Sequence, residues 1–165
     1  MTYKDTYVKL ADFGRELLSK TSLKEGIPLI SKYAKAVIGA QRCSIFIYDN
    51  EKKQLWTTLA DNIEKIEIPA NQGLVGHTLK EKKPLIENDP YSNPHFLPDI
   101  DKISGYSTQN IITAPIFNAT REIIGVLELL NKEGGYNDSD MKFIIFFAHY
   151  ISGFLDLINQ IGRDE

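Results

Sequence analysis

The side chains best able to do covalent or metal chemistry are few and widely separated. The chain of 165 residues has one cysteine, Cys43, and three histidines, His77, His95 and His149. An enzyme site needs a nucleophile beside a base, a pair of carboxylates or a metal cluster. The histidines show none of the familiar metal-ligand spacings, and the sequence has neither a glycine-rich phosphate loop with lysine nor a Gly-x-Ser-x-Gly motif. The sequence therefore predicts a protein that is not an enzyme and holds no metal.

The composition is that of an ordinary globular domain, with 42% hydrophobic and 25% charged residues and a net charge of -3. A chain of this length fits one domain. It has no basic footprint for nucleic acid, no polybasic segment for anionic lipid, and no apolar run approaching the roughly 20 residues that cross a bilayer. The N-terminus lacks a secretory pattern, and the lone Cys43 excludes an internal disulfide. We expect a cytoplasmic protein with neither a nucleic-acid nor a membrane partner.

Helical spacing of apolar residues marks three long segments. The first lies near the N-terminus, and the second follows the capping sequence Ser22-x-x-Glu25 and ends at Gly39. Pro28 lies late for a first turn, so the second helix is expected to begin near Ile27 or to bend there. The third follows a capping sequence, Asn137-x-x-Asp140, and has the most regular stripe. That stripe consists of Ile144, Phe147, Ile151, Phe154, Ile158 and Ile161.

Between the second and third helices, apolar residues alternate as in half-buried strands. The expected strands cover residues 43–48, 54–60, 66–68, 110–117 and 123–131, with a short helix after Gly73. Residues 88–107 form a long irregular stretch, and loops of that length are usually functional or disordered. Its aromatic and imidazole side chains could give it a small core, which favours an ordered lid: Tyr91, His95, Phe96 and Tyr106. This element order predicts an α+β antiparallel sheet with helices on one face.

Several short motifs follow one another in a fixed order and spacing. They are Arg42-Cys43-Ser44-Ile45-Phe46, Ile68-Pro69-x-x-x-Gly73-Leu74-Val75-Gly76, Asp101-x-x-Ser104-Gly105-Tyr106-x-Thr108-x-Asn110-Ile111, Pro115-Ile116, and Gly125-Val126-x-Glu128-Leu129-x-Asn131-Lys132. Together they resemble the GAF domains of cyclic-nucleotide phosphodiesterases, some bacterial adenylate cyclases and bacterial signalling proteins. The resemblance covers residues 22–158. It implies a GAF-like α+β fold, related to PAS and profilin, whose long lid loop covers the sheet face opposite the helices.

The resemblance also implies one concave pocket for a small polar ligand. Hydroxyl and carboxyl groups would enter it from the first strand, the lid and the fifth strand, and backbone N–H groups from a helix start. The ligand-binding residues carried over in this way are Ser44, Asp61, Leu74, Val75, Asp101, Ser104, Thr108 and Glu128.

The sequence departs from the cyclic-nucleotide pattern at one point. Nucleotide-binding members usually carry a base-stacking aromatic residue before the aspartate, and here that pair is Ala60-Asp61. Stacking on a base contributes about 1–3 kcal/mol. A cyclic nucleotide, another small molecule and no ligand at all therefore stay open, and no cofactor is implied. Some GAF-fold proteins reduce free methionine sulfoxide with several cysteines, and the lone Cys43 argues against that activity.

A further signature follows the fifth strand. Asn131, Lys132 and Asp140 match the pattern of the phosphodiesterase subfamily, with Tyr136 where phenylalanine is usual. Lys132 is close enough in sequence to reach Asp140 at the start of the last helix, where a carboxylate is favoured by the helix dipole. We interpret these four residues as a structural clasp outside the pocket.

The sequence thus predicts a non-catalytic, small-molecule-sensing regulatory domain of a signal-transduction protein. Residues 1–21 would form a dimerisation or linker helix, residues 22–158 the GAF domain, and residues 159–165 a tail toward an output domain. The last helix has a second apolar stripe, Met141, Ile145 and Ala148, which predicts a homodimer through the terminal helices. The other expected partner is an output domain or signalling protein. The alternative is a structural dimerisation module without a ligand.

Overall fold

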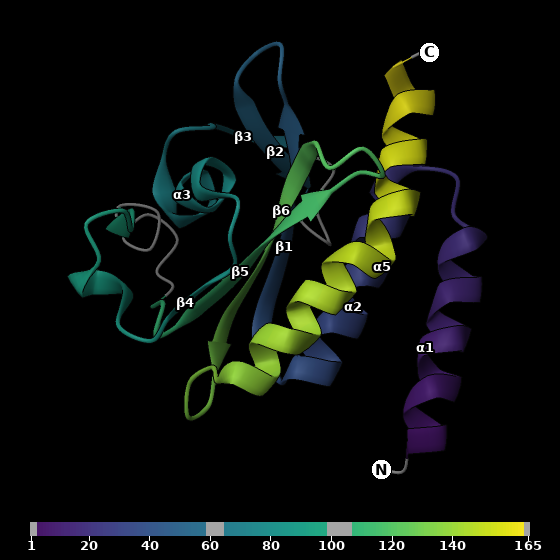
Figure 1. The fold of residues 1–165 in the computed structure, drawn as a ribbon, viewed down its shortest axis with the longest axis horizontal. Coiled ribbons are helices and arrows are strands. Elements are labelled where there is room, and N and C mark those ends of the chain that lie inside the picture. Colours follow the sequence, from purple (N-terminus) through teal and green to yellow (C-terminus); the bar gives the residue numbers. More distant parts are fainter. Residues whose placement is uncertain (1–2, 59–64, 99–106, 164–165) are drawn as a thin grey trace.

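The computed structural model describes residues 3–58, 65–98 and 107–163. Within them the chain forms helices around one antiparallel sheet, whose strands lie in the order β3-β2-β1-β6-β5-β4 (Figure 1). The elements in chain order are α1 (Tyr3–Leu18), α2 (Leu23–Ile38), β1 (Ala40–Asp49), β2 (Gln54–Thr58), β3 (Lys65–Pro69), α3 (Gly73–Glu81), β4 (Leu85–Glu87), the 3-10 turn η1 (Pro90–Ser92), β5 (Ile111–Phe117), β6 (Ile123–Lys132) and α5 (Asp138–Arg163).

The sheet has helices on both sides. The long helices α2 and α5 cover one face, and the shorter α3 lies over the other (Figure 1). The predicted α+β fold class is therefore confirmed. The helices are not confined to one face as expected, because α3 packs on the second face through Val75 and Leu79. The sequence analysis missed β4, which pairs with β5 and forms the edge of the sheet. Three residues directly after Pro84 are too few to show an alternating pattern.

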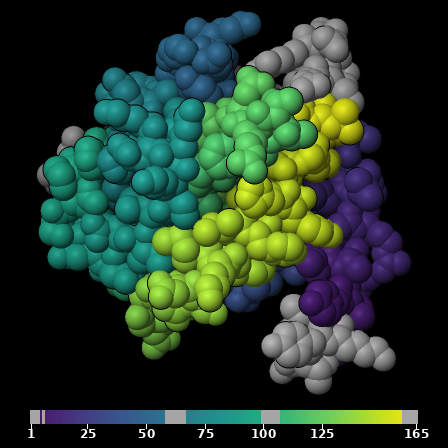
Figure 2. All heavy atoms as spheres, viewed as in Figure 1, coloured from purple at the N-terminus to yellow at the C-terminus, as the bar shows by residue number. Residues whose placement is uncertain are grey.

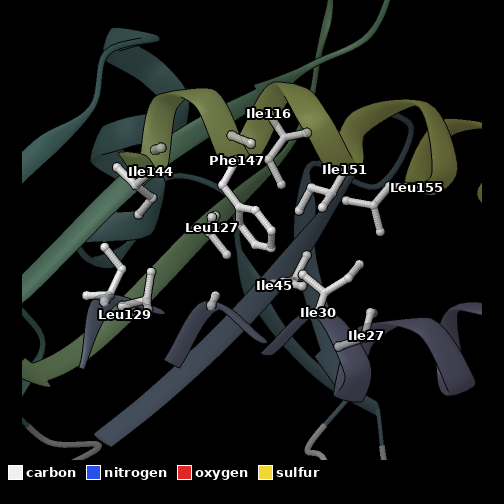
Figure 3. Packing of buried hydrophobic residues seen from close by; sticks show 14 of the residues in the cluster. Ile27, Ile30, Ile45, Ile116, Leu127, Leu129, Ile144, Phe147, Ile151 and Leu155 are labelled. Atoms are coloured by element: carbon white, nitrogen blue, oxygen red, sulfur yellow. The ribbon is translucent and has the colours of Figure 1, made fainter. Parts of the chain in front are cut away.

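The main core lies between the sheet and the two long helices. Phe147 is fully buried at its centre, and Ile144, Ile151 and Leu155 extend the same stripe of α5 (Figure 3). They pack against strand residues and against α2, including Ile45, Leu127, Ile27 and Ile30. Burying an aliphatic or aromatic side chain of this size stabilises a fold by about 1.5–3 kcal/mol. This packing fixes α5 on the sheet.

The capping residues of α2 act as the sequence predicts. The Ser22 side chain accepts a hydrogen bond from Glu25 N at 3.2 Å, and Gly39 ends the helix in a left-handed conformation with φ of 84°. The helix begins at Leu23, which excludes the alternative that it begins near Ile27. Pro28 is accommodated inside the helix, at the cost of one backbone hydrogen bond.

One face of α5 remains at the surface, where the helix runs beside α1 (Figure 2). By length and composition Asp138–Ile158 could cross a membrane, with a mean hydropathy of 1.5, which corrects the expectation that no segment approaches that length. In this fold the same segment covers the sheet with its buried stripe. Of the predicted second stripe, only Ile145 is exposed, because Ala148 is buried and Met141 packs against the core. The side of α5 opposite the buried stripe exposes large apolar side chains: Ile145, Phe146, Tyr150 and Leu157.

Candidate functional site

A row of polar side chains crosses the middle of the sheet on the face that α3 covers. Ser44 of β1 lies opposite Glu128 of β6, which in turn lies opposite Thr113 of β5. Residues directly opposite one another in antiparallel strands project to the same face. Ser44 and Glu128 are half-buried and Thr113 is fully buried. The structure thus brings two predicted contact residues together and adds Thr113, the one hydroxyl in an otherwise apolar strand.

The helix α3 contacts this row through Thr78 in its second turn. The Thr78 hydroxyl donates to Leu74 O at 2.9 Å and lies 2.6 Å from the Thr113 hydroxyl. Both threonines are buried, so this contact holds the helix at one height above β5. Val75 packs on the same face of the sheet. Gln72 at the N-cap makes no side-chain capping bond, and helix geometry leaves the first-turn N–H groups without intrahelical acceptors. Such a turn suits a polar or anionic ligand.

Both ends of the predicted lid are hydrogen-bonded to one short segment at the end of β6, residues 131–136. At the first end, Asn88 Nδ2 donates to Tyr136 O at 3.2 Å and Tyr136 N donates to Asn88 Oδ1 at 3.0 Å. At the second end, Gln109 N donates to Asn131 Oδ1 at 2.6 Å and Asn131 Nδ2 donates to Ser107 O at 2.8 Å. Residues 131–136 therefore fix both ends of the lid.

The same segment is tied to the start of α5. Lys132 N donates to Asn110 Oδ1 at 2.8 Å, and Asn110 Nδ2 donates to Lys132 O at 2.9 Å. Its ammonium group donates to Asp140 Oδ1 at 2.6 Å, so the predicted contact between Lys132 and Asp140 is present. Asn137 and Asp140 form a reciprocal capping box, with both bonds at 3.0 Å. The four predicted clasp residues thus connect β6, the lid ends and the first turn of α5.

Three of the predicted contact residues, Asp61, Asp101 and Ser104, lie outside the described residues. Thr108 is buried, between the two lid residues that Asn131 holds. Sequence reasoning missed Asn88, whose partner is 48 positions away. Asn110 was part of the motif but was assigned no contact. Nothing local marks either asparagine, because each acts on a distant backbone.

Two of the histidines meet in space. The rings of His77 on α3 and His95 after η1 stack with centroids 4.0 Å apart and an angle of 15° between their planes. His149 is exposed on α5. No group of three or more histidine, cysteine, aspartate or glutamate side chains in the described ranges could hold a metal. The stacked rings join α3 to the part of the lid that follows η1.

Cys43 lies on the opposite face of the sheet from the polar row. It packs beside α2, and burial raises the pKa of its thiol to about 12, against the opposing effects of a hydrogen bond with Ser31 and the charge of Lys35. Glu128 raises the pKa slightly further. Part of the residue still reaches solvent, but the thiol is enclosed in the packed face. The thiol is therefore neutral, and thus unreactive, at neutral pH.

We expect native Cys43 to react with iodoacetamide at pH 8 at least about tenfold more slowly than in urea, because only the thiolate attacks. The unfolded thiol ionises near a pKa of about 8.5, below its folded value. Its contribution to stability is therefore complete below about pH 8.5 and is lost as the pH rises toward 12. Mass spectrometry of the alkylated chain measures the rate at one site, since the chain has one cysteine. Rapid labelling of the native protein would contradict the assignment.

The chain is similar to proteins of known family and structure. A GAF domain family model matches residues 23–154. The dual 3',5'-cyclic-AMP and -GMP phosphodiesterase 11A of Takifugu rubripes is 27% identical over 130 residues, which cover 69% of this chain but only 14% of that protein. The GAF domain of an Acinetobacter phosphoenolpyruvate-protein phosphotransferase superposes with a TM-score of 0.79 at 15% identity, over 99% of each chain. The free methionine-R-sulfoxide reductase of Neisseria meningitidis, solved with its substrate, has a TM-score of 0.71 at 17% identity, over 92% of this chain and 89% of that one.

Proposed function

Because the chain belongs to the GAF domain family, we propose that it is a non-catalytic regulatory module that binds a small polar molecule between the polar row and α3. The polar row supplies the Ser44 hydroxyl and the Glu128 carboxyl group, and α3 supplies the first-turn N–H groups of Leu74 and Val75. Thr108 adds a lid hydroxyl. Hydroxyl, carboxyl and amide groups of this kind suit a polar ligand.

One observation carries the proposal. The segment 131–136 is hydrogen-bonded to both ends of the lid, and its Lys132 is paired with Asp140 in the first turn of α5. A ligand that favours one position of the lid therefore also favours one position of the α5 start. The resulting shift is bounded by the ligand's difference in affinity for the two states. We propose that α5 carries this shift to an output domain or a partner protein.

A cyclic nucleotide is the first ligand to test. Support comes from the relative that is a phosphodiesterase for cyclic AMP and cyclic GMP. The absence of catalysis is part of the proposal, although a reductase of free methionine sulfoxide shares the fold. Reduction of a sulfoxide by thiols needs two electrons, which a pair of cysteines supplies by forming a disulfide. This chain has one cysteine, and its thiol faces α2 rather than the polar row.

Thermal unfolding with cyclic AMP, cyclic GMP and a panel of metabolites tests the proposal. At a hundredfold excess over Kd, a ligand should stabilise the fold by about 2.7 kcal/mol, which raises Tm by about 5–10 °C. Ser44→Ala and Glu128→Gln should reduce that rise, whereas the exposed control Ser19→Ala should keep it. If no compound moves Tm, the sensor proposal fails. If only the cyclic nucleotides fail, the ligand is a different molecule.

A ligand-free dimerisation module is the second candidate, and the exposed stripe of α5 favours it. Phe146 and Leu157 expose 48% and 58% of their surface, and Tyr150 exposes 39%. Large apolar side chains gathered on one helix face are typical of a surface that a partner covers. We propose a homodimer through α5 and α1 in either case. Sedimentation velocity tests the dimer itself. The thermal unfolding experiment separates the candidates, because the structural module would be a dimer whose stability no small molecule changes.

A further inference from the structure

A groove of about 1140 Å³ runs along the outer side of α3, away from the polar row. Its walls come from the β1–β2 turn, residues 70–73, α3 itself and the segment after η1, which lie around α3 in Figure 1. Ser44, Thr113 and Glu128 are not among its lining residues. The stacked rings of His77 and His95 hold one wall against the helix. The groove therefore shares only the start of α3, at Gln72, Gly73 and Gly76, with the proposed ligand site.

The groove is cationic on a chain whose net charge is negative. Lys53, Lys80 and Lys82 line it, against a single carboxylate from Glu81, while the whole chain has a net charge of -3. The Lys53 ammonium donates to Asn50 Oδ1 at 2.7 Å, which holds it at the turn. An excess of positive charge in a concave surface attracts anions and raises their local concentration.

Two of these lysines occupy unfavourable backbone positions. Lys53 has φ of 54° and Lys82 has φ of 57°, in the left-handed region that asparagine and glycine adopt more easily. Lys82 is the C-cap of α3, where glycine or asparagine is usual. Backbone stability alone therefore does not account for lysine at either position. A role for the two ammonium groups accounts for it.

The base of the groove is apolar. Leu79 is 8% exposed there, and Ala70, Leu97 and Ile123 continue the apolar surface. A peptide segment that combines carboxylates with apolar side chains is complementary both to this base and to the lysine rim.

From the apolar base and the lysine rim together, we propose that this groove binds an acidic, extended peptide segment of a partner protein. The carboxylates of the segment pair with Lys53, Lys80 and Lys82, and its apolar side chains rest on Leu79 and Ile123. The three lysines are not part of the proposed ligand site, which shares only the start of α3 with this groove, so either proposal can fail without the other.

Fluorescence anisotropy with a labelled peptide that alternates glutamate with leucine tests the assignment. A peptide of the same length that alternates lysine with leucine is the probe for non-specific adhesion. The test variant is Lys53→Asn/Lys80→Gln/Lys82→Asn, in which the two asparagines suit the left-handed positions. The control variant, Lys9→Gln/Lys24→Gln/Lys32→Gln, removes three exposed lysines of α1 and α2 and changes the net charge equally.

We expect the acidic peptide to bind the native chain, to bind the test variant at least about tenfold more weakly, and to bind the control variant as it binds the native chain. Added salt should weaken binding, because the rim charges are exposed. Equal loss in both variants, or equal binding of the lysine peptide, would overturn the proposal. Displacement of the peptide by inorganic phosphate at similar molar concentration would also overturn it, since the groove would then be a small-anion site.

Discussion

Replacing Phe147 with alanine is expected to destabilise the fold by about 3–5 kcal/mol, the usual cost of removing a buried phenylalanine. Phe147 is fully buried, and its ring lies 5.6 Å from that of Phe13, 5.5 Å from that of Tyr33 and 5.5 Å from that of Phe143. One substitution therefore removes the common partner of three helices, α1, α2 and α5. The cavity cannot collapse easily, because the sheet forms its other wall.

Urea denaturation followed by circular dichroism measures this loss, and the midpoint should fall with little change in the m-value. The neighbouring Phe146→Ala is the matched control, because it removes the same side chain from a position that is 48% exposed. Its effect on the isolated chain should stay within about 1 kcal/mol. Equal losses in the two variants would show that α5 is not seated on the sheet by this stripe.

Replacing Asn131 with alanine is expected to cost about 3 kcal/mol. The side chain is buried and satisfies three backbone groups: Gln109 N, Asn110 N and Ser107 O. Each buried polar group left without a partner costs about 1–3 kcal/mol, reduced where water can enter. Asn131 also has φ of 64°, a conformation that alanine adopts only with strain.

Asn131→Gly separates the two contributions to that loss. Glycine adopts the left-handed backbone without strain, so the stability that Asn131→Gly loses reports the lost hydrogen bonds alone. Both variants should also be cleaved faster by protease between residues 88 and 110, because the second end of the lid is no longer held. A glycine variant as stable and as resistant as the native chain would show that the Asn131 side chain does not hold the lid.

Local patterns predicted the elements whose burial follows a period. The stripe of Ile144, Phe147 and Ile151 is fully buried against the sheet, as its spacing indicates. The capping residues Ser22 and Asn137 also act where the sequence places them. These features depend on neighbours within a few residues, so a single sequence records them.

Contacts between residues far apart in the chain leave no such pattern in a single sequence. The hydrogen bonds of Asn88 with Tyr136 join residues 48 positions apart, and the His77–His95 stack joins an α3 side chain to the lid. A polar residue that satisfies a distant backbone group looks like any loop residue in the sequence. The resemblance to a family supplied Ser44 and Glu128 as neighbours, which strand register then explained. The place of Thr113 in the polar row was not predicted, because the family motif does not include this residue.

The hydrogen bonds at the two lid ends have a consequence for affinity. Bringing the ends of a chain segment together carries an entropic cost, which either the fold or the ligand must offset. Here Asn88 at the first end is bonded to Tyr136, and Ser107 at the second end is bonded to Asn131. These native hydrogen bonds offset the cost before any molecule binds. A small ligand with only a few contacts can then bind usefully, since less of its interaction energy goes into ordering the protein.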